Sequence, residues 1–310
     1  MENYTLIDTH CDTITKLLDN NKKLYENDCS IDIKRGKNYK NYAQFFAIFT
    51  EEKYFSNPNK RVDDAISFFY NEIEENSNYI EFCKNTTDMK NAFSNNKIAA
   101  FLSIEGADAI KNEEMFQKYY NDGVRMISPT WNNDNIIAGG IGNNDKGLTE
   151  FGKRIITLMN DKKIILDLSH SSEQTFYECF DIYSKLIICS HSNSKVICNN
   201  NRNITDDQFK MIMKSNGVCS ITFYPPFIRK KGAVTPDEIT KHILHFLELG
   251  GEDNISIGSD FDGMSIFPQG IYGIESTYKL FDNLRQTGVN DEIINKIAYK
   301  NMERIISICL

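Results

Sequence analysis

The stretch Thr5-Leu-Ile-Asp-Thr-His-Cys-Asp12 opens the chain with an apolar run that ends on residues able to bind a metal ion. His10 and Asp12 are two positions apart, so on an extended strand their side chains point to the same side, and Cys11 points to the other. The pair therefore offers a nitrogen and a carboxylate oxygen to one divalent cation. Taken alone it is a weak signal, because a histidine near a strand end can simply be hydrogen-bonded.

Four further apolar runs end in the same way, each on a histidine or an acidic residue. They span 100–105, 164–170, 186–191 and 255–260, and their last residues are Glu105, His170, His191 and Asp260. Parallel strands that close into a barrel deliver the residues at their carboxyl ends to one rim. Five such runs therefore predict a metal-dependent active site in a barrel and favour a metallohydrolase.

The pattern along the chain predicts an α/β protein. Strand-like runs recur at 4–8, 44–49, 98–104, 123–128, 163–168, 186–190, 217–223 and 255–259. Helical periodicity separates most of them, at 61–82, 113–121, 149–160, 173–184, 205–215 and 236–249. Eight near-continuous apolar strands that alternate with helices indicate a parallel sheet closed as a (β/α)8 TIM barrel. An open doubly wound sheet is less favoured, since no G-x-G-x-x-G follows the first strand.

We expect one domain over residues 1–310, with two C-terminal helices, 276–286 and 290–308, packed outside the barrel. The segments 19–43 and 138–147 have the composition of loops, and the second could form part of the rim over the site. No internal repeat or linker suggests a second domain.

Composition narrows the range of partners. The formal net charge of −8 argues against a nucleic-acid or anionic-membrane partner, because such surfaces attract an excess of Lys and Arg. No run of about 18 apolar residues and no signal-like start is visible, so we expect a cytoplasmic protein. The eight cysteines form no C-x-x-C pair and are expected to be free, buried thiols.

The histidines and Glu105 are the best ligand candidates. His170 and His191 each follow aliphatic residues and a serine, and neutral imidazoles at strand ends suit zinc. Glu105 precedes Gly106, which gives the backbone room to turn, and its carboxylate could bridge two cations. Each residue alone has an ordinary structural explanation, but together with His10 and Asp12 they provide enough ligands for two metal ions.

The remaining two histidines, His242 and His245, lie in the predicted helix 236–249 and are expected at the surface.

Two further residues could act on a substrate. Asp260 ends the last strand, where a carboxylate near a metal-activated water can carry a proton during hydrolysis. Asp262 lies one step further into the loop and is the less favoured candidate. Arg202 could bind a substrate carboxylate in a bidentate fork, although an ordinary surface arginine fits its spacing equally well.

Seven segments in this order resemble the motifs of the membrane (renal) dipeptidase family, dinuclear zinc peptidases of the amidohydrolase-like barrel superfamily. They are Asp8-Thr-His-Cys-Asp12, Ile104-Glu-Gly106, Asp167-Leu-Ser-His-Ser171, Cys189-Ser-His-Ser192, Arg202-Asn-Ile-Thr-Asp-Asp207, Phe223-Tyr224 and Gly258-Ser-Asp-Phe-Asp-Gly263. The resemblance covers nearly the whole barrel.

The resemblance implies two zinc ions per subunit, with other divalent metals such as manganese or iron as alternatives. His10, Asp12 and Glu105 would hold one ion, and Glu105, His170 and His191 the other. A hydroxide bridging the two would attack the carbonyl of the dipeptide.

By the same resemblance, Arg202 would bind the C-terminal carboxylate of the substrate. Asp260 would handle the proton and contact the free amino group, and Tyr224 would line the pocket.

The chain departs from many family members at one position. Where they carry a histidine that stabilises the tetrahedral intermediate, the segment Ile127-Ser-Pro-Thr-Trp-Asn132 has Trp131. The indole can stack and donate one N–H but carries no positive charge, and losing one oxyanion donor typically costs about 3 kcal/mol. Trp-Asn in this place resembles a bacterial branch of the family.

The sequence therefore predicts a metal-dependent dipeptidase that hydrolyses unblocked dipeptides, including those with a C-terminal D-residue. The family's "membrane" is not carried over, because no secretion signal or lipid-anchor tail is visible, and the resemblance allows a homodimer. Three alternatives stay open. They are another amidohydrolase-type hydrolase of a lactam, cyclic amide or N-acyl amino acid, a non-catalytic metal-binding barrel, and a zinc-free aldolase- or isomerase-like barrel.

Overall fold

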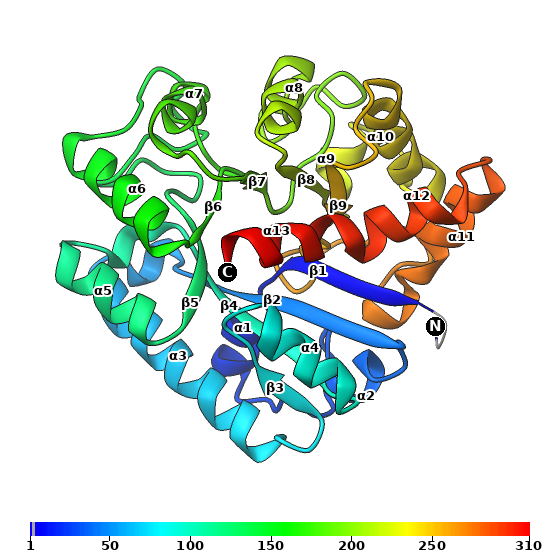
Figure 1. Ribbon diagram of the computed structural model, residues 1–310, viewed down its shortest axis with the longest axis horizontal. Helices are drawn as coiled ribbons and strands as arrows, with labels where there is room; N and C mark the ends of the chain where they lie inside the picture. The colour runs from blue at the N-terminus through cyan, green and yellow to red at the C-terminus, as the bar shows by residue number, and fades with distance from the viewer. Residues whose placement is uncertain (2–3) are drawn as a thin grey trace.

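Eight parallel strands close into a barrel in the computed structural model, which describes residues 1 and 4–310 (Figure 1). They are β1 (Thr5–Cys11), β2 (Asn41–Phe49), β4 (Ile98–Glu105), β5 (Val124–Ser128), β6 (Ile165–Asp167), β7 (Ile187–Cys189), β8 (Val218–Ile221) and β9 (Ile255–Ile257). The ring closes because β1 pairs with both β2 and β9, and β2 pairs with β4. The predicted (β/α)8 fold is confirmed, and each of the eight predicted strands overlaps one of these.

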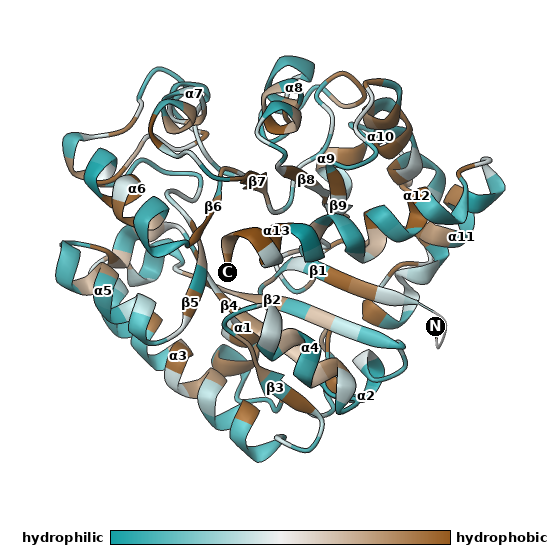
Figure 2. Ribbon diagram, viewed as in Figure 1, coloured by the Kyte–Doolittle hydropathy of each residue, from teal (hydrophilic) through white to brown (hydrophobic). Residues whose placement is uncertain are grey.

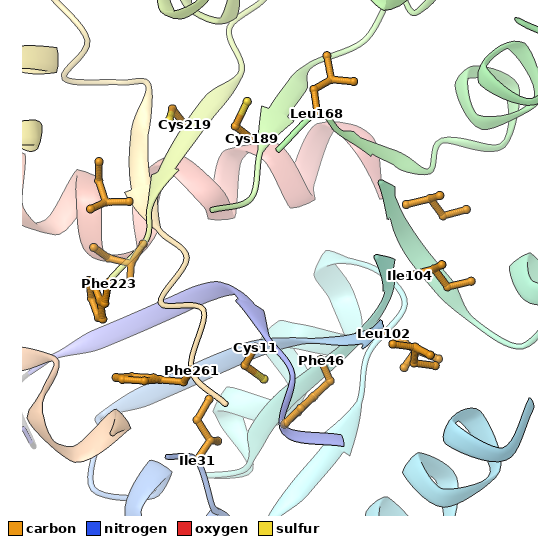
Figure 3. Close-up of a cluster of buried hydrophobic side chains, with 14 of the residues drawn as sticks. Cys11, Ile31, Phe46, Leu102, Ile104, Leu168, Cys189, Cys219, Phe223 and Phe261 are labelled. Carbon is orange, nitrogen blue, oxygen red and sulfur yellow. The ribbon is translucent and has the colours of Figure 1, made fainter. Parts of the chain in front are cut away.

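Alternate residues of the strands fill two cores. On β2 and β4, Phe45 and Phe101 point into the barrel, where their rings stack with centroids 4.7 Å apart. Their neighbours Phe46 and Leu102 belong to a second cluster, between the strands and the surrounding helices. Figure 3 shows side chains of this outer cluster spread around the strands. Burial on both faces explains why the strands are nearly continuous apolar runs.

Helices cover the outside of the barrel, with hydrophilic residues toward solvent (Figure 2). Those that follow the predicted ranges are α3 (Pro58–Glu75), α5 (Glu113–Asn121), α6 (Glu150–Lys162), α7 (Glu173–Ile182), α8 (Asp206–Lys214) and α10 (Pro236–Glu248). Two of them begin with capping boxes, in which the side chains of Thr205 and Thr235 pair with Gln208 and Glu238.

The C-terminal segment consists of α11 (Tyr278–Gln286), α12 (Asp291–Asn295), a π-helical turn (Lys296–Lys300) and α13 (Asn301–Cys309). Helix α11 packs beside α10, but α13 lies across the ring of strands (Figure 1). Its Ile305 and Ile306 join Phe45 and Phe101 in the inner cluster. Helix α13 therefore closes the amino-terminal end of the barrel instead of packing among the outer helices.

The sequence missed one strand and several short helices. The predicted helix 61–82 starts at Pro58 and ends at Glu75, and its last residues form β3 (Ile80–Phe82) instead, which pairs with the first residues of β4. The unpredicted helices are α1 (Thr13–Asn20), α2 (Ile33–Gly36), α4 (Thr86–Ser94) and α9 (Pro225–Ile228). The first two lie in or beside the predicted loop 19–43. They are one to three turns long, too short for periodicity to mark clearly.

All eight cysteines are free and buried, as predicted. Among residues 1 and 4–310, no helix is both long and apolar enough to cross a membrane.

Candidate active site

The carboxyl ends of the strands surround a pocket of about 550 Å³. Eight of the predicted site residues line it: Asp12, Glu105, Trp131, His170, His191, Arg202, Tyr224 and Asp260. The ninth, His10, is buried beneath it and turns its Nε2 toward the carboxylates. The barrel thus brings together residues from both ends of the chain.

The first ligand group forms where β1 ends. The Nε2 atom of His10 lies 3.6 Å from Asp12 Oδ2 and 3.6 Å from Glu105 Oε2. The pairing of β1 with β2 shifts register between Asp8 and Cys11, an irregularity that re-aims the side chains that follow. Asp12 lies just beyond the strand, at the start of α1.

The second group shares Glu105. Its Oε1 atom lies 2.8 Å from His170 Nε2 and 3.4 Å from His191 Nε2, so its two oxygens face different groups. Gly106 turns the chain away at a φ of +81°, and a side chain there would crowd the backbone of Trp131. Glu105 therefore has the placement of a bridging carboxylate.

These residues fit a pair of divalent cations. His10 Nε2 and Asp12 Oδ1 are buried without a hydrogen-bond partner, a cost that a bound cation would remove. Three overlapping groups have ligand atoms within 4.8 Å of one another: His10, Asp12 and Glu105; Glu105, His170 and His191; and His10, His191 and Asp260. Imidazole and carboxylate ligands suit zinc and similar transition metals.

Burial and mutual charge shift the pKa values of these groups. Burial raises the pKa of Glu105 well above its usual value and that of Asp260 to about 7. Burial lowers the pKa of His10, but the charges of Glu105, Asp12 and Asp260 outweigh it and raise the value to about 10. The cluster around His10 thus favours positive charge at its centre.

His170 and His191 behave oppositely. Burial lowers the pKa of both well below the usual value, and the positive charge of Arg202 adds to the effect. Both rings are therefore neutral near pH 7, the form that binds a metal ion.

Arg202 is buried and reaches into the pocket. Its Nη2 lies 2.9 Å from His170 Nε2, and its Nη1 donates to the carbonyl of Ser169. Its Nε has no partner, and no carboxylate among the described residues forms an ion pair with it. A buried guanidinium without a carboxylate of its own is suited to bind one from a ligand.

Asp260 and Asp262 lie in a loop tied to β1. Both have left-handed backbones, with φ of 64° and 71°. Asp260 lies 3.9 Å from His10 and faces the pocket. Asp262 also lines the pocket, but its carboxylate accepts hydrogen bonds from Thr13 and Lys16 and so holds the loop in place. The preference for Asp260 over Asp262 stays a prediction.

Aromatic side chains form the upper walls of the pocket. Trp131 packs on Phe49, with ring centroids 4.9 Å apart, and Tyr224 packs edge-on against Phe227 at 4.8 Å. The sequence interpretation included Trp131 and Tyr224 but missed Phe49 and Phe227, because nothing in their local patterns distinguishes them from core residues.

The predicted surface position of His242 is wrong. Its ring is fully buried, Nδ1 accepts from the Ser194 N–H at 3.0 Å and Nε2 lies 3.0 Å from the Ile228 carbonyl. It thereby anchors the loop that follows His191. His245 is half-buried and pairs with Asp206 at 2.7 Å. Helical spacing placed His242 and His245 close together on α10, but it could not tell which side of the helix faces the barrel.

Asn132 is a site residue that the sequence interpretation did not assign. Its Oδ1 lies 2.9 Å from His170 Nδ1, so it accepts the proton on that nitrogen and leaves Nε2 unprotonated, where it faces Arg202 Nη2. The only local signal was its place beside Trp131.

The barrel and its cluster of histidines and carboxylates define a metal-dependent hydrolase of the TIM-barrel class. A sequence model of the membrane dipeptidase family, peptidase family M19, matches residues 1–309. A protein of Schizosaccharomyces pombe described as an uncharacterized dipeptidase is 32% identical over 293 residues, which cover 85% of this chain and 68% of that protein.

Two solved structures show the same fold. A metallopeptidase from Rhodobacter sphaeroides, liganded with a phosphinate mimic of the dipeptide L-Ala-D-Ala, superposes with a TM-score of 0.92 at 22% identity, covering 99% of this chain and 100% of that one. The probable dipeptidase PvdM from Pseudomonas aeruginosa superposes with a TM-score of 0.85 at 16% identity, covering 91% and 90%.

The chain belongs to the membrane dipeptidase family and is a peptide-bond hydrolase.

Proposed function

We propose that this protein is a dipeptidase with two zinc ions that hydrolyses unblocked dipeptides, including those with a C-terminal D-residue. One observation carries the proposal. The two oxygens of Glu105 face two separate ligand groups on the floor of a pocket that also holds Arg202 and Asp260.

His10, Asp12 and Glu105 would hold one cation, and Glu105, His170 and His191 the other. When bound, such cations act as Lewis acids that polarise the scissile carbonyl and lower the pKa of a water molecule.

The protein's own groups fix the two ends of the substrate. Arg202 forms a fork with the C-terminal carboxylate, since it is a buried cation without a carboxylate partner. Asp260 accepts hydrogen bonds from the free amino group and moves a proton during cleavage. Fixing both ends limits the substrate to a dipeptide.

Tolerance of a D-residue is supported by the solved Rhodobacter sphaeroides relative, which is described with a mimic of L-Ala-D-Ala. Trp131 adds an aromatic wall beside His170, with ring centroids 6.1 Å apart. Its indole excludes water from the reacting carbonyl without adding a positive charge.

The test is a set of initial rates on L-Ala-D-Ala, L-Ala-L-Ala, Ala-Ala-Ala and N-acetyl-Ala-Ala, with zinc-loaded and chelator-stripped enzyme. Zinc-dependent cleavage of the two free dipeptides alone is expected. Cleavage of the acetylated substrate would instead support a broader amidohydrolase. If neither free dipeptide is cleaved by zinc-loaded enzyme, the proposal is wrong.

A cytoplasmic location and a homodimer belong to the same proposal. Cell fractionation and sedimentation of the purified enzyme would test them.

A further inference from the structure

Asp167 is the most completely bonded carboxylate near the site, although it does not line the pocket. It is fully buried at the end of β6. Its Oδ2 accepts from the hydroxyls of Ser128 at 2.5 Å and Ser190 at 2.6 Å. Its Oδ1 accepts from the backbone N–H groups of Ser169 and Ser190, at 3.1 and 2.7 Å, and from the Ser169 hydroxyl at 2.7 Å.

This arrangement reaches His191 through Ser190. The Ser190 Oγ lies 2.8 Å from His191 Nδ1. A hydroxyl has one hydrogen, and Ser190 donates it to Asp167. Its oxygen must therefore accept, so the proton of the imidazole lies on His191 Nδ1. The other nitrogen, Nε2, then carries no proton; it lies 3.4 Å from Glu105 Oε1 and 2.8 Å from His170 Nε2, the other imidazole nitrogen assigned as a ligand.

We propose that Asp167 is a positioning residue that, through Ser190, fixes the tautomer of His191 so that its Nε2 can bind a metal ion. This inference rests on the ligand role proposed for His191. It assigns to Asp167 the part that Asn132 plays for His170, and the two histidines thus receive the same tautomer from different partners. Partners that orient metal-bound histidines in this way typically contribute roughly 10- to 100-fold to metal affinity.

The same chain of bonds fixes the strand end. The Ser169 hydroxyl donates to Asp167 and accepts from the backbone N–H of His191 at 3.0 Å. The segments that follow β6 and β7, which carry His170 and His191, are thus joined around one buried carboxylate.

Asp167→Asn is a sharp test because it keeps the shape of the side chain. Two backbone N–H groups point at the Oδ1 position, so the amide oxygen must stay there and the NH2 group must face Ser190. Ser190 then accepts from Asn and donates to His191 Nδ1. The imidazole proton moves to Nε2 and blocks the ligand atom.

Two measurements follow the change without relying on turnover. Two-bond ¹H–¹⁵N spectra of metal-free protein, labelled at histidine, should show His191 protonated at Nδ1 in the wild type and at Nε2 in Asp167→Asn. Titration with Zn²⁺ should show one of two sites weakened by roughly 10- to 100-fold, with the other little changed.

Ser128→Ala is the matched control. It removes a donor from the same Oδ2 atom without touching His191, so it should keep the wild-type tautomer and zinc affinity. Ser190→Ala is the second variant, in case Asp167→Asn does not fold. It removes the acceptor of His191 Nδ1 and should weaken the same zinc site.

If folded Asp167→Asn keeps the proton on His191 Nδ1 and binds zinc as the wild type does, the inference is overturned. Unchanged zinc affinity in Ser190→Ala would overturn it as well. Failure of the proposed function is a different result. A wild-type protein that binds zinc but cleaves no dipeptide would refute the dipeptidase proposal and leave the tautomer result intact.

Discussion

At the scale of single residues, burial without a partner is the clearest guide to function. Arg202 is almost fully buried, yet its charge is not paired with a carboxylate of the described chain. Such a group is costly unless a ligand satisfies it. Arg229 shows the contrast, because it is half-exposed and pairs with Glu238 at 3.3 Å.

We expect Arg202→Ala to lower kcat/KM on free dipeptides by about two orders of magnitude, chiefly through KM. Two charge-assisted hydrogen bonds to the substrate carboxylate would be lost, worth roughly 3 kcal/mol together. Steady-state kinetics on L-Ala-L-Ala and its C-terminal amide would measure this. The amide should lose little from the substitution, and Arg229→Ala should affect neither substrate. Equal losses on both substrates would refute the carboxylate role.

A second residue, His242, links pH to stability. Burial lowers its pKa from 6.5 to about 4. Between these values the unfolded chain binds a proton that the folded protein excludes. Stability should therefore fall as the pH falls from about 6.5 and level off near 4, by roughly 3 kcal/mol in total from this residue.

His242→Gln should remove that part of the pH dependence, because the amide can accept from Ser194 and donate to Ile228 without taking up a proton. Urea unfolding at pH 7, 6 and 5 would compare the slopes. His245→Gln, on the same helix, is the control. Its free energy of unfolding should change with pH as in the wild type, because His242 is still present. A wild-type slope in His242→Gln would contradict the prediction.

At the scale of elements, α13 covers the amino-terminal end of the barrel. Ile306 is fully buried in the inner cluster, whereas Ile308, two positions on, is 53% exposed. The site lies at the opposite end of the strands, so the helix contributes to stability and not to chemistry.

Ile306→Ala should destabilise the fold by roughly 2–5 kcal/mol, since it removes buried methyl groups and leaves a cavity. Ile308→Ala should cost at most about 0.5 kcal/mol. Chemical denaturation measures both, and kcat/KM at 20 °C should stay near wild type in each. A large loss of activity in folded Ile306→Ala would show that the two ends of the barrel are coupled.

At the scale of the whole molecule, the site concentrates negative charge at the rim of a barrel whose first and last strands, β1 and β9, pair with each other. Asp12, Glu105 and Asp260 all face His10 within 3.9 Å. Burying several carboxylates side by side opposes folding unless positive charge lies between them.

Removal of metal should therefore destabilise the entire barrel. At a free zinc concentration about 100 times Kd, binding contributes roughly 3 kcal/mol to the free energy of unfolding. Calorimetry should show a Tm several degrees lower after chelation, restored by added zinc. Glu105→Gln is the matched variant, in which chelation should shift the Tm much less. An unchanged Tm for chelated wild type would contradict metal binding at this site.

The sequence by itself determined the barrel and the types of residue at its rim. Apolar runs that end on His10, Glu105, His170, His191 and Asp260 are local patterns, and parallel strands bring such ends to one rim whatever their separation in the chain. The alternation of strands and helices could also be predicted, because apolar periodicity is a local pattern.

Only the tertiary structure decided which groups meet. It decided that the two oxygens of Glu105 face different histidines, that Asn132 orients His170, and that His242 is buried. It also decided that α13 covers the end of the barrel and that Asp167 reaches His191 through Ser190. Most of these contacts join residues that are distant along the chain, so local patterns cannot predict them. Periodicity shows on which face of a helix or strand a residue lies, but not which residues pack against that face.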